Sequence, residues 1–141
     1  MGSNPTVATY SKKLKLYSIE EAESLIPELK PILKDIRDKG KEYTKCLIDS
    51  AQLVINFRNN PYDTEGVLDR TIKTRKELRE LFNNLEKYGV ILRDIDKGGV
   101  DFPAEVDGEE VMLCWRAFEE SKISYWHTKD ETCTMRKPLK R

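Results

Sequence analysis

Long apolar runs are missing from this chain of 141 residues, which excludes a membrane-spanning helix of roughly 18 or more apolar residues. Histidine occurs once and cysteine three times, without a Cys-x-x-Cys pair, so the sequence shows no multi-histidine metal site, disulfide framework or zinc spacing. Net charge is also lacking, because 25 basic residues balance 25 acidic ones. The N-terminus has no apolar signal-peptide core, and no glycine-rich phosphate loop is present. We therefore expect a cytoplasmic protein with no metal, cofactor or membrane attachment.

The size and composition of the chain fit one domain, residues 1–141. Charged residues make up 35% of the chain and apolar residues 38%, and the apolar residues recur along its whole length, which argues against general disorder. We expect residues 1–12 to be disordered and the alternating residues 13–17 to form a short strand. Ser18-Ile19-Glu20-Glu21 is a capping box, so a helix is predicted to begin there.

Two long helices are predicted over residues 18–88. Apolar residues recur every three or four positions for about five and a half heptads, as in a coiled coil, with interruptions at Gly40 and Ser50. They are Ile19, Ala22, Ile26, Leu29, Leu33, Ile36, Tyr43, Leu47, Val54 and Phe57. Pro27 and Pro31 lie outside this stripe and remove backbone donors, so we expect a bend near residues 23–31. A turn at 59–63 and a second helix ending at Gly89 predict an antiparallel αα-hairpin.

After Gly89 the hydrophobic period changes to two, which predicts an antiparallel β-meander over residues 90–127. Its predicted strands are 90–95, 100–106, 109–116 and 122–127. Asp107-Gly108 predicts a two-residue turn that pairs Pro103 with Met112. A five-residue loop at 117–121 then pairs Arg116 with Lys122 and Leu113 with Tyr125. The predicted fold class is therefore α+β: a long coiled-coil-like hairpin followed by three to four strands packed on the first helix.

This register divides the strand residues between two faces. The predicted core face carries Val100, Phe102, Ala104, Val111, Leu113, Trp115, Ile123, Tyr125 and His127. The opposite face carries Asp101, Pro103, Glu105, Met112, Cys114, Arg116, Ser124 and Trp126. A tryptophan and a methionine beside charged residues are not ordinary solvent-face composition. A shift of one residue in either hairpin would exchange the faces of a strand.

Several segments resemble a known family. They are Tyr17-Ser18-Ile19-Glu20-Glu21-Ala22, Leu25-Ile26-Pro27-Glu28-Leu29, Val100-Asp101-Phe102-Pro103-Ala104, Asp107-Gly108, Leu113-Cys114-Trp115-Arg116 and Trp126-His127. Together they resemble domain of unknown function 2203, a family of uncharacterised prokaryotic proteins, over about residues 14–139. The chain departs from that family at Ala117-Phe118-Glu119-Glu120, in place of a Gly-Glu-Pro turn, and at 130–135, in place of a glycine-rich stretch. The resemblance implies a fold but no activity.

His127 and Cys114 are the residues that could take part in catalysis. His127 could be a general base or a histidine that caps the core at a strand end; its candidate carboxylate partners are Asp101, Asp130 and Glu131. Cys114 could be a nucleophile activated by Arg116 or His127, but the predicted register puts Cys114 and His127 on opposite faces. We therefore predict no catalytic residue, and we expect Cys114 to be a partly buried, inert thiol.

The candidate ligand- or partner-binding residues are Asp101, Arg116, Trp126, His127 and Arg136. The forked donors of Arg116 and Arg136 suit a carboxylate or phosphate, although Arg116 could instead pair with Asp101 or Glu105 across the strands. Trp126 could stack on a ligand or fill a dimer interface, and an exposed sheet face with large apolar residues favours the interface.

Charge is unevenly distributed along the neutral chain. Residues 101–131 contain three basic and nine acidic residues, a balance of 3 − 9 = −6, whereas residues 134–141 contain four basic and no acidic residues. The basic tail could fold back on the acidic sheet or stay in solvent. Basic residues of the second helix alternate with acidic ones, which is typical of a solvated face rather than a nucleic-acid stripe.

These features predict a non-enzymatic interaction module. It would form homo-oligomers, most simply a dimer, or bind an unidentified protein through the helical hairpin and the outer sheet face. The alternative is an enzyme or small-ligand binder with a pocket around Asp101, Arg116, Trp126 and His127. A third hypothesis is weak nucleic-acid binding through the second helix and the basic tail.

Overall fold

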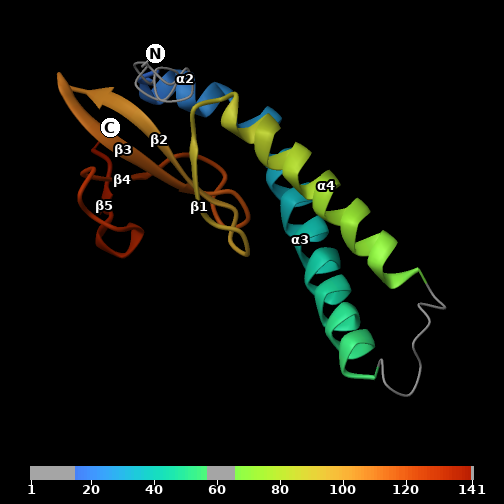
Figure 1. Cartoon of the computed structure of the whole chain (residues 1–141). Helices are drawn as coiled ribbons and strands as arrows, with labels where there is room; N and C mark the ends of the chain where they lie inside the picture. The colour runs from blue at the N-terminus through green and yellow to red at the C-terminus, as the bar shows by residue number, and fades with distance from the viewer. Residues whose placement is uncertain (1–14, 57–65, 141) are drawn as a thin grey trace, which may run out of the picture.

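The computed structural model describes residues 15–56 and 66–140. A long helical hairpin extends from one side of a small sheet (Figure 1), which confirms the α+β class. The helices are α2 (Ile19–Ser24), α3 (Ile26–Ile55) and α4 (Val67–Glu86), with a 3-10 turn η1 (Cys133–Met135). The antiparallel strands follow chain order in the sheet: β1 (Ile91–Asp94), β2 (Gly99–Val106), β3 (Glu109–Arg116), β4 (Tyr125–His127) and β5 (Lys137–Pro138). In this part of the chain, no helix combines the length and apolar character that a membrane span needs.

The first helical segment begins at the predicted capping box and is interrupted at Leu25. The Ser18 hydroxyl accepts from the Glu21 N–H at 3.0 Å, and the Glu21 carboxylate accepts from the Ser18 N–H at 2.9 Å. The helix starts again at Ile26, with Pro27 in the first turn, where a backbone donor is not needed. The interruption lies within the region where the prolines predicted a bend.

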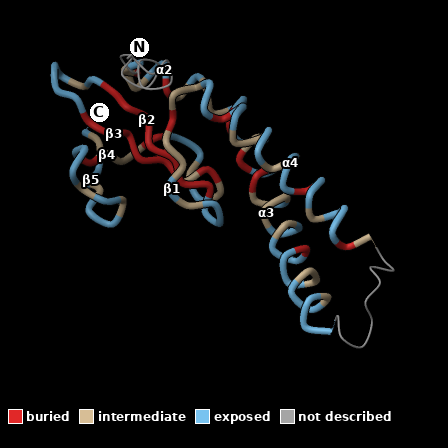
Figure 2. The backbone as a smooth tube through the Cα atoms, viewed as in Figure 1, coloured by how far each residue is buried: buried red, intermediate tan, exposed pale blue. Residues whose placement is uncertain are grey.

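The main core lies between the sheet and the first half of α3. Leu29, Leu33 and Ile36 pack with residues of β2 and β3, including Phe102 and Trp115. Figure 2 shows this as buried backbone along β2 and β3 and on the adjoining turns of the helices. The predicted packing of the sheet on the start of the first helix is therefore present. Tyr17 adds a parallel bridge to Ala104 of β2, and residues 1–14 lie outside the described residues.

Among residues 15–56 and 66–140, the side chains that pack on the far half of the hairpin, away from the sheet, come from α3 and α4 themselves. Ser50 and Thr71 share a hydrogen bond of 2.8 Å between α3 and α4, and Cys46 contacts Thr74 at 3.9 Å. Large apolar side chains on this half are exposed; they are Leu47, Ile48, Val54, Ile55, Leu68 and Ile72. Two positions of the predicted heptad stripe, Leu47 and Val54, are therefore not buried against α4. The predicted turn at 59–63 lies outside the described residues.

The pairing of β2 with β3 confirms the predicted register of the first β-hairpin. Pro103 lies opposite Met112, and Val106 lies opposite Glu109. Asp107 and Gly108 both have positive φ, 53° and 79°, as a type I′ turn requires. Because the two turn residues alone set the pairing of the strands beside them, this register could be predicted from the sequence.

The predicted register of the second β-hairpin is wrong by one residue. Leu113 pairs with Trp126 rather than Tyr125, and Met112 pairs with His127. The regular pairing begins only at Tyr125. Before it, Ile123 donates its N–H to the Glu23 carboxylate of α2 at 3.1 Å. The Trp115 indole also donates to the Glu120 carbonyl at 3.0 Å within the connecting loop. The shift moves Tyr125 and His127 to the face of Cys114, and it moves Trp126 to the core face.

The segment expected to be a basic tail folds back on the acidic sheet. Lys137 and Pro138 form β5 beside β4. Arg136 pairs with Glu120 at 2.7 Å, and Lys137 pairs with Glu131 at 2.7 Å. These pairs bring the turn η1, which comes just before them, onto the outer face of the sheet.

We predict that Leu33→Ala destabilises the protein by about 2–5 kcal/mol because Leu33 is 1% exposed in the core. Ile95→Ala, outside the helical hairpin, is the control, because Ile95 is 39% exposed, and its effect should stay within about 0.5 kcal/mol. Urea unfolding followed by circular dichroism measures both values. Equal losses would contradict this location of the core.

Candidate metal centre

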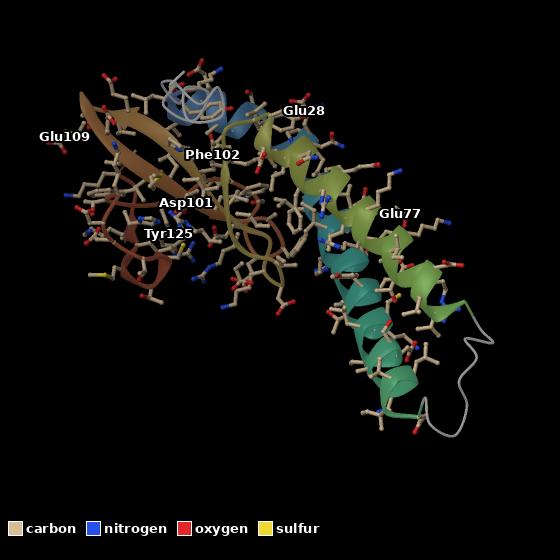
Figure 3. The ribbon with its side chains drawn as sticks, in the orientation of Figure 1. Glu28, Glu77, Asp101, Phe102, Glu109 and Tyr125 are labelled. Carbon is tan, nitrogen blue, oxygen red and sulfur yellow. The ribbon has the colours of Figure 1, made fainter. Side chains whose placement is uncertain are left out.

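Four side chains with metal-binding atoms meet on the outer face of the sheet. Asp101 comes from β2, Cys114 from β3, His127 from the end of β4 and Cys133 from η1. Asp101, Cys114 and His127 share this face because Asp101 lies opposite Cys114, and Met112, two residues before Cys114, lies opposite His127. In Figure 3 Asp101 and Tyr125 lie within the sheet, far from Glu77 on α4.

The potential ligand atoms of these residues lie within 4.8 Å of one another. Cys133 Sγ is 3.8 Å from Asp101 Oδ1 and 3.9 Å from His127 Nε2. His127 Nε2 is 3.0 Å from Asp101 Oδ2. A tetrahedral zinc ion with bonds of about 2.0–2.3 Å would separate its ligand atoms by roughly 3.3–3.8 Å. The separations of 3.0, 3.8 and 3.9 Å lie close to this range, and the others, up to 4.8 Å, require small side-chain shifts for all four groups to bind one ion.

The hydrogen bonding of His127 directs one ring nitrogen at this cluster. Nδ1 lies 2.7 Å from the Thr128 carbonyl oxygen, which can only accept, so Nδ1 carries a hydrogen. Nε2 then faces the Asp101 carboxylate and Cys133 Sγ, so it is the ring nitrogen directed at the cluster. A backbone carbonyl that holds one nitrogen while the other binds a metal is the usual arrangement of a metal-binding histidine.

Asp101 is a carboxylate with no exposed surface. Arg93 Nε donates to its Oδ2 at 2.8 Å, which leaves Oδ1 directed toward Cys133. Burial of an ionised carboxylate is costly unless opposite charge is close. Arg93 therefore supplies compensating charge from β1 while one carboxylate oxygen stays available to a ligand.

Burial, followed by the charge of Asp101 and the neighbouring Cys133, raises the pKa of the Cys114 thiol to about 12. A hydrogen bond from Arg136 acts in the opposite direction. Arg136 also stacks on the Tyr125 ring at 3.9 Å. Cys114 is thus a protonated thiol at neutral pH unless a cation binds beside it. A metal ion is the kind of charge that deprotonates a coordinating thiol outright.

A catalytic cysteine–histidine–carboxylate triad fits this geometry poorly. Such a triad places the nucleophile and the carboxylate on opposite ring nitrogens of the histidine. Here Cys133 and Asp101 both approach Nε2 of His127, and Thr128 occupies Nδ1. Convergence of three donor groups on one point is instead the geometry of shared coordination.

The structure places four of the five predicted site residues at or beside the outer face of the sheet and Trp126 on the opposite face. Asp101 and His127 meet in the cluster, and Arg136 contacts the cluster through a hydrogen bond to Cys114. Arg116 lies on the same face two residues beyond Cys114, where it pairs with Glu119 at 3.6 Å. Trp126 lies on the opposite face and lines a separate cavity of about 500 Å³ with residues that include Val111 and Leu139. The predicted pocket around all of these residues is therefore not one site.

Cys133 was missed, and Cys114 was judged inert. No metal site was expected, because the three cysteines show no short-range ligand spacing. The available signal was the parity of Asp101, Cys114 and His127 on paired strands, which the one-residue register error concealed.

The chain belongs to the family DUF2203, described as "Uncharacterized conserved protein", whose family model matches residues 15–139. This confirms the resemblance seen in the sequence segments. Searches of curated proteins and of solved structures found no significant match.

We predict that Asp101→Asn lowers the free energy of unfolding by about 1–3 kcal/mol in the presence of a chelator, because it weakens buried, charge-assisted hydrogen bonds. The matched control is Asp38→Asn, whose carboxylate pairs with Lys34 on an exposed helix face. The control should leave the urea midpoint unchanged. Similar midpoints for the two variants would show that Asp101 is not held as described.

Proposed function

We propose that this protein binds one zinc ion through Asp101, Cys114, His127 and Cys133. The observation that carries the proposal is the convergence of four potential ligand atoms within 4.8 Å, supplied by three strands and a 3-10 turn. Three of the four residues are buried, so the donors are held in place by the sheet rather than by a mobile surface.

The donor types favour zinc over harder cations. Two thiolates and an imidazole suit Zn²⁺, whereas Mg²⁺ and Ca²⁺ prefer oxygen donors. Two thiolates, one carboxylate and a divalent ion would leave a charge of about −1. Arg93 and Arg136 lie against Asp101 and Cys114, where they can balance that charge.

Zinc would also connect parts of the chain that are far apart in the sequence. Cys133 lies between β4 and β5, and the other three ligands lie on β2, β3 and β4. Coordination would therefore join the returning C-terminal segment to the middle of the sheet. Because binding requires deprotonated thiols and a neutral imidazole, zinc affinity should fall as the pH is lowered.

We predict that the purified chain takes up one Zn²⁺ or Co²⁺ ion, and that Cys133→Ala and His127→Ala each weaken uptake at least about tenfold. Cys46→Ala is the matched control, since Cys46 lies in the hairpin and contacts Thr74. The visible absorption of Co²⁺ bound to thiolate, followed by competition with Zn²⁺, measures uptake.

Elemental analysis should give one zinc per chain, and circular dichroism should show that each variant remains folded. An absence of metal uptake by the folded wild-type chain would contradict the proposal. Equal uptake by Cys46→Ala and Cys133→Ala would contradict it as well, because only Cys133 lies in the cluster.

A second candidate function is self-association through the far half of the hairpin. Six large apolar side chains gather there, and exposed apolar patches commonly mark interaction sites. A two-helix hairpin has one helical layer, and a second copy would complete a four-helix arrangement that covers both helices. The dimer predicted from the heptad pattern would thus use the hairpin, whereas Trp126 packs against the core.

We predict a dimer in sedimentation velocity, and we predict that Ile72→Glu converts it to a monomer, because Ile72 is 67% exposed on the far half of α4. Ile95→Glu is the matched control on the sheet side of the molecule and should leave the dimer intact. A wild-type chain that stays monomeric at all accessible concentrations would exclude this second function.

A further inference from the structure

A cavity of about 550 Å³ lies beside the four-residue cluster. Cys114 and Cys133 line it, whereas Asp101 and His127 have no exposed surface and are not part of its wall. The sulfur side of the cluster is therefore the side that reaches this space. Its volume falls in the range of about 300–1,000 Å³ that small-molecule sites occupy.

Lys97 and Arg116 both line this cavity, and backbone hydrogen bonds join the two segments that carry them. The Ala117 N–H donates to the Gly98 carbonyl at 3.0 Å, and the Phe118 N–H donates to the Lys97 carbonyl at 3.2 Å. These two bonds join the β1–β2 turn to the residues that directly follow Arg116. The ends of two different strand connections thus place two cations on one wall.

The turn that carries Lys97 is fixed by its own chemistry. The Asp94 carboxylate accepts from the Lys97 N–H at 3.0 Å. Gly98 has a φ of 67°, and a Cβ atom there would lie 2.9 Å from the Phe118 ring. Gly98 therefore permits both the left-handed turn and its close contact with the β3–β4 loop.

The two cations retain donors for a ligand. Among the described residues, Lys97 makes no ion pair, and the pair of Arg116 with the exposed Glu119 is long, at 3.6 Å. Two of the three acids on the wall are engaged elsewhere, since Asp94 caps the turn and Glu131 pairs with Lys137, whereas Asp130 is exposed to solvent. Arg93, also on the wall, is bound to Asp101.

We propose that this cavity binds a small oxyanion, a carboxylate or phosphate group, between Lys97 and Arg116 and beside the metal centre. The position beside a metal rests on the proposed zinc function, whereas the two cations do not depend on it. A guanidinium fork and an ammonium group together suit an anion with several oxygen atoms. The protein would then hold a small acidic molecule next to the thiolate side of the zinc ion.

The test measures binding of inorganic phosphate and of acetate by calorimetry, using the full chain with and without bound Co²⁺. At least one of these anions should bind, and comparison of the two distinguishes phosphate from carboxylate recognition. Lys97→Gln and Arg116→Gln should each weaken that binding at least about fivefold, since each removes a charged hydrogen-bond donor. Lys122→Gln, an exposed lysine outside the cavity wall, is the matched control and should bind as the wild type does.

Uptake of Co²⁺ is measured on the same variants and should be unchanged, because Lys97 and Arg116 are not among the four metal-binding residues. Failure of both anions to bind to a chain that takes up Co²⁺ would overturn the oxyanion site and leave the metal function standing. Binding that is equal in wild type, Lys97→Gln and Arg116→Gln would also overturn it. Anion binding that is lost in those variants, in a chain that takes up no Co²⁺, would support the oxyanion site and overturn the zinc function.

Discussion

The Asp101 carboxylate lies on β2, between β1 and β3, and has no exposed surface. Its charge must therefore be balanced by neighbouring groups rather than by water. Arg93 reaches it from β1, and His127 reaches it from β4. Cys133 approaches its other oxygen from η1. Because these partners come from separate segments, one buried charge requires four parts of the chain to take up fixed relative positions. The cluster and the return of the C-terminal segment both follow from this requirement.

The helical hairpin and the sheet carry different kinds of side chain that could bind a partner or ligand. The buried ionisable residues Asp101 and His127 lie with Cys114 and Cys133 on the outer face of the sheet, whereas the far half of the hairpin carries exposed apolar side chains. The first half of α3 joins the two regions, because Leu29, Leu33 and Ile36 form a core with β2 and β3. A ligand at the sheet and a second copy at the hairpin would therefore occupy different surfaces, and neither function requires the other.

Local chemistry explains which parts of the fold could be predicted from the sequence. The capping box at Ser18 and the Asp107-Gly108 turn are complete within a few residues, and both are present as predicted. The second β-hairpin depends on a hydrogen bond between Ile123 and Glu23, which are 100 positions apart. The sequence pattern within residues 117–127 gives no sign of that bond. Counting residues around the loop therefore predicted a β3–β4 register that is wrong by one residue.

That single-residue error decided how the candidate site was interpreted. With Leu113 opposite Tyr125, Cys114 and His127 lie on opposite faces and the lone histidine has no metal-binding partner. With Leu113 opposite Trp126, the same residues lie on one face together with Asp101. Cys133 then joins them because Arg136 and Lys137 pair with Glu120 and Glu131, which holds the adjacent turn against the sheet. The neutral total charge thus conceals an acidic sheet and a basic tail, and ion pairs between them help to bring the four side chains of the cluster together.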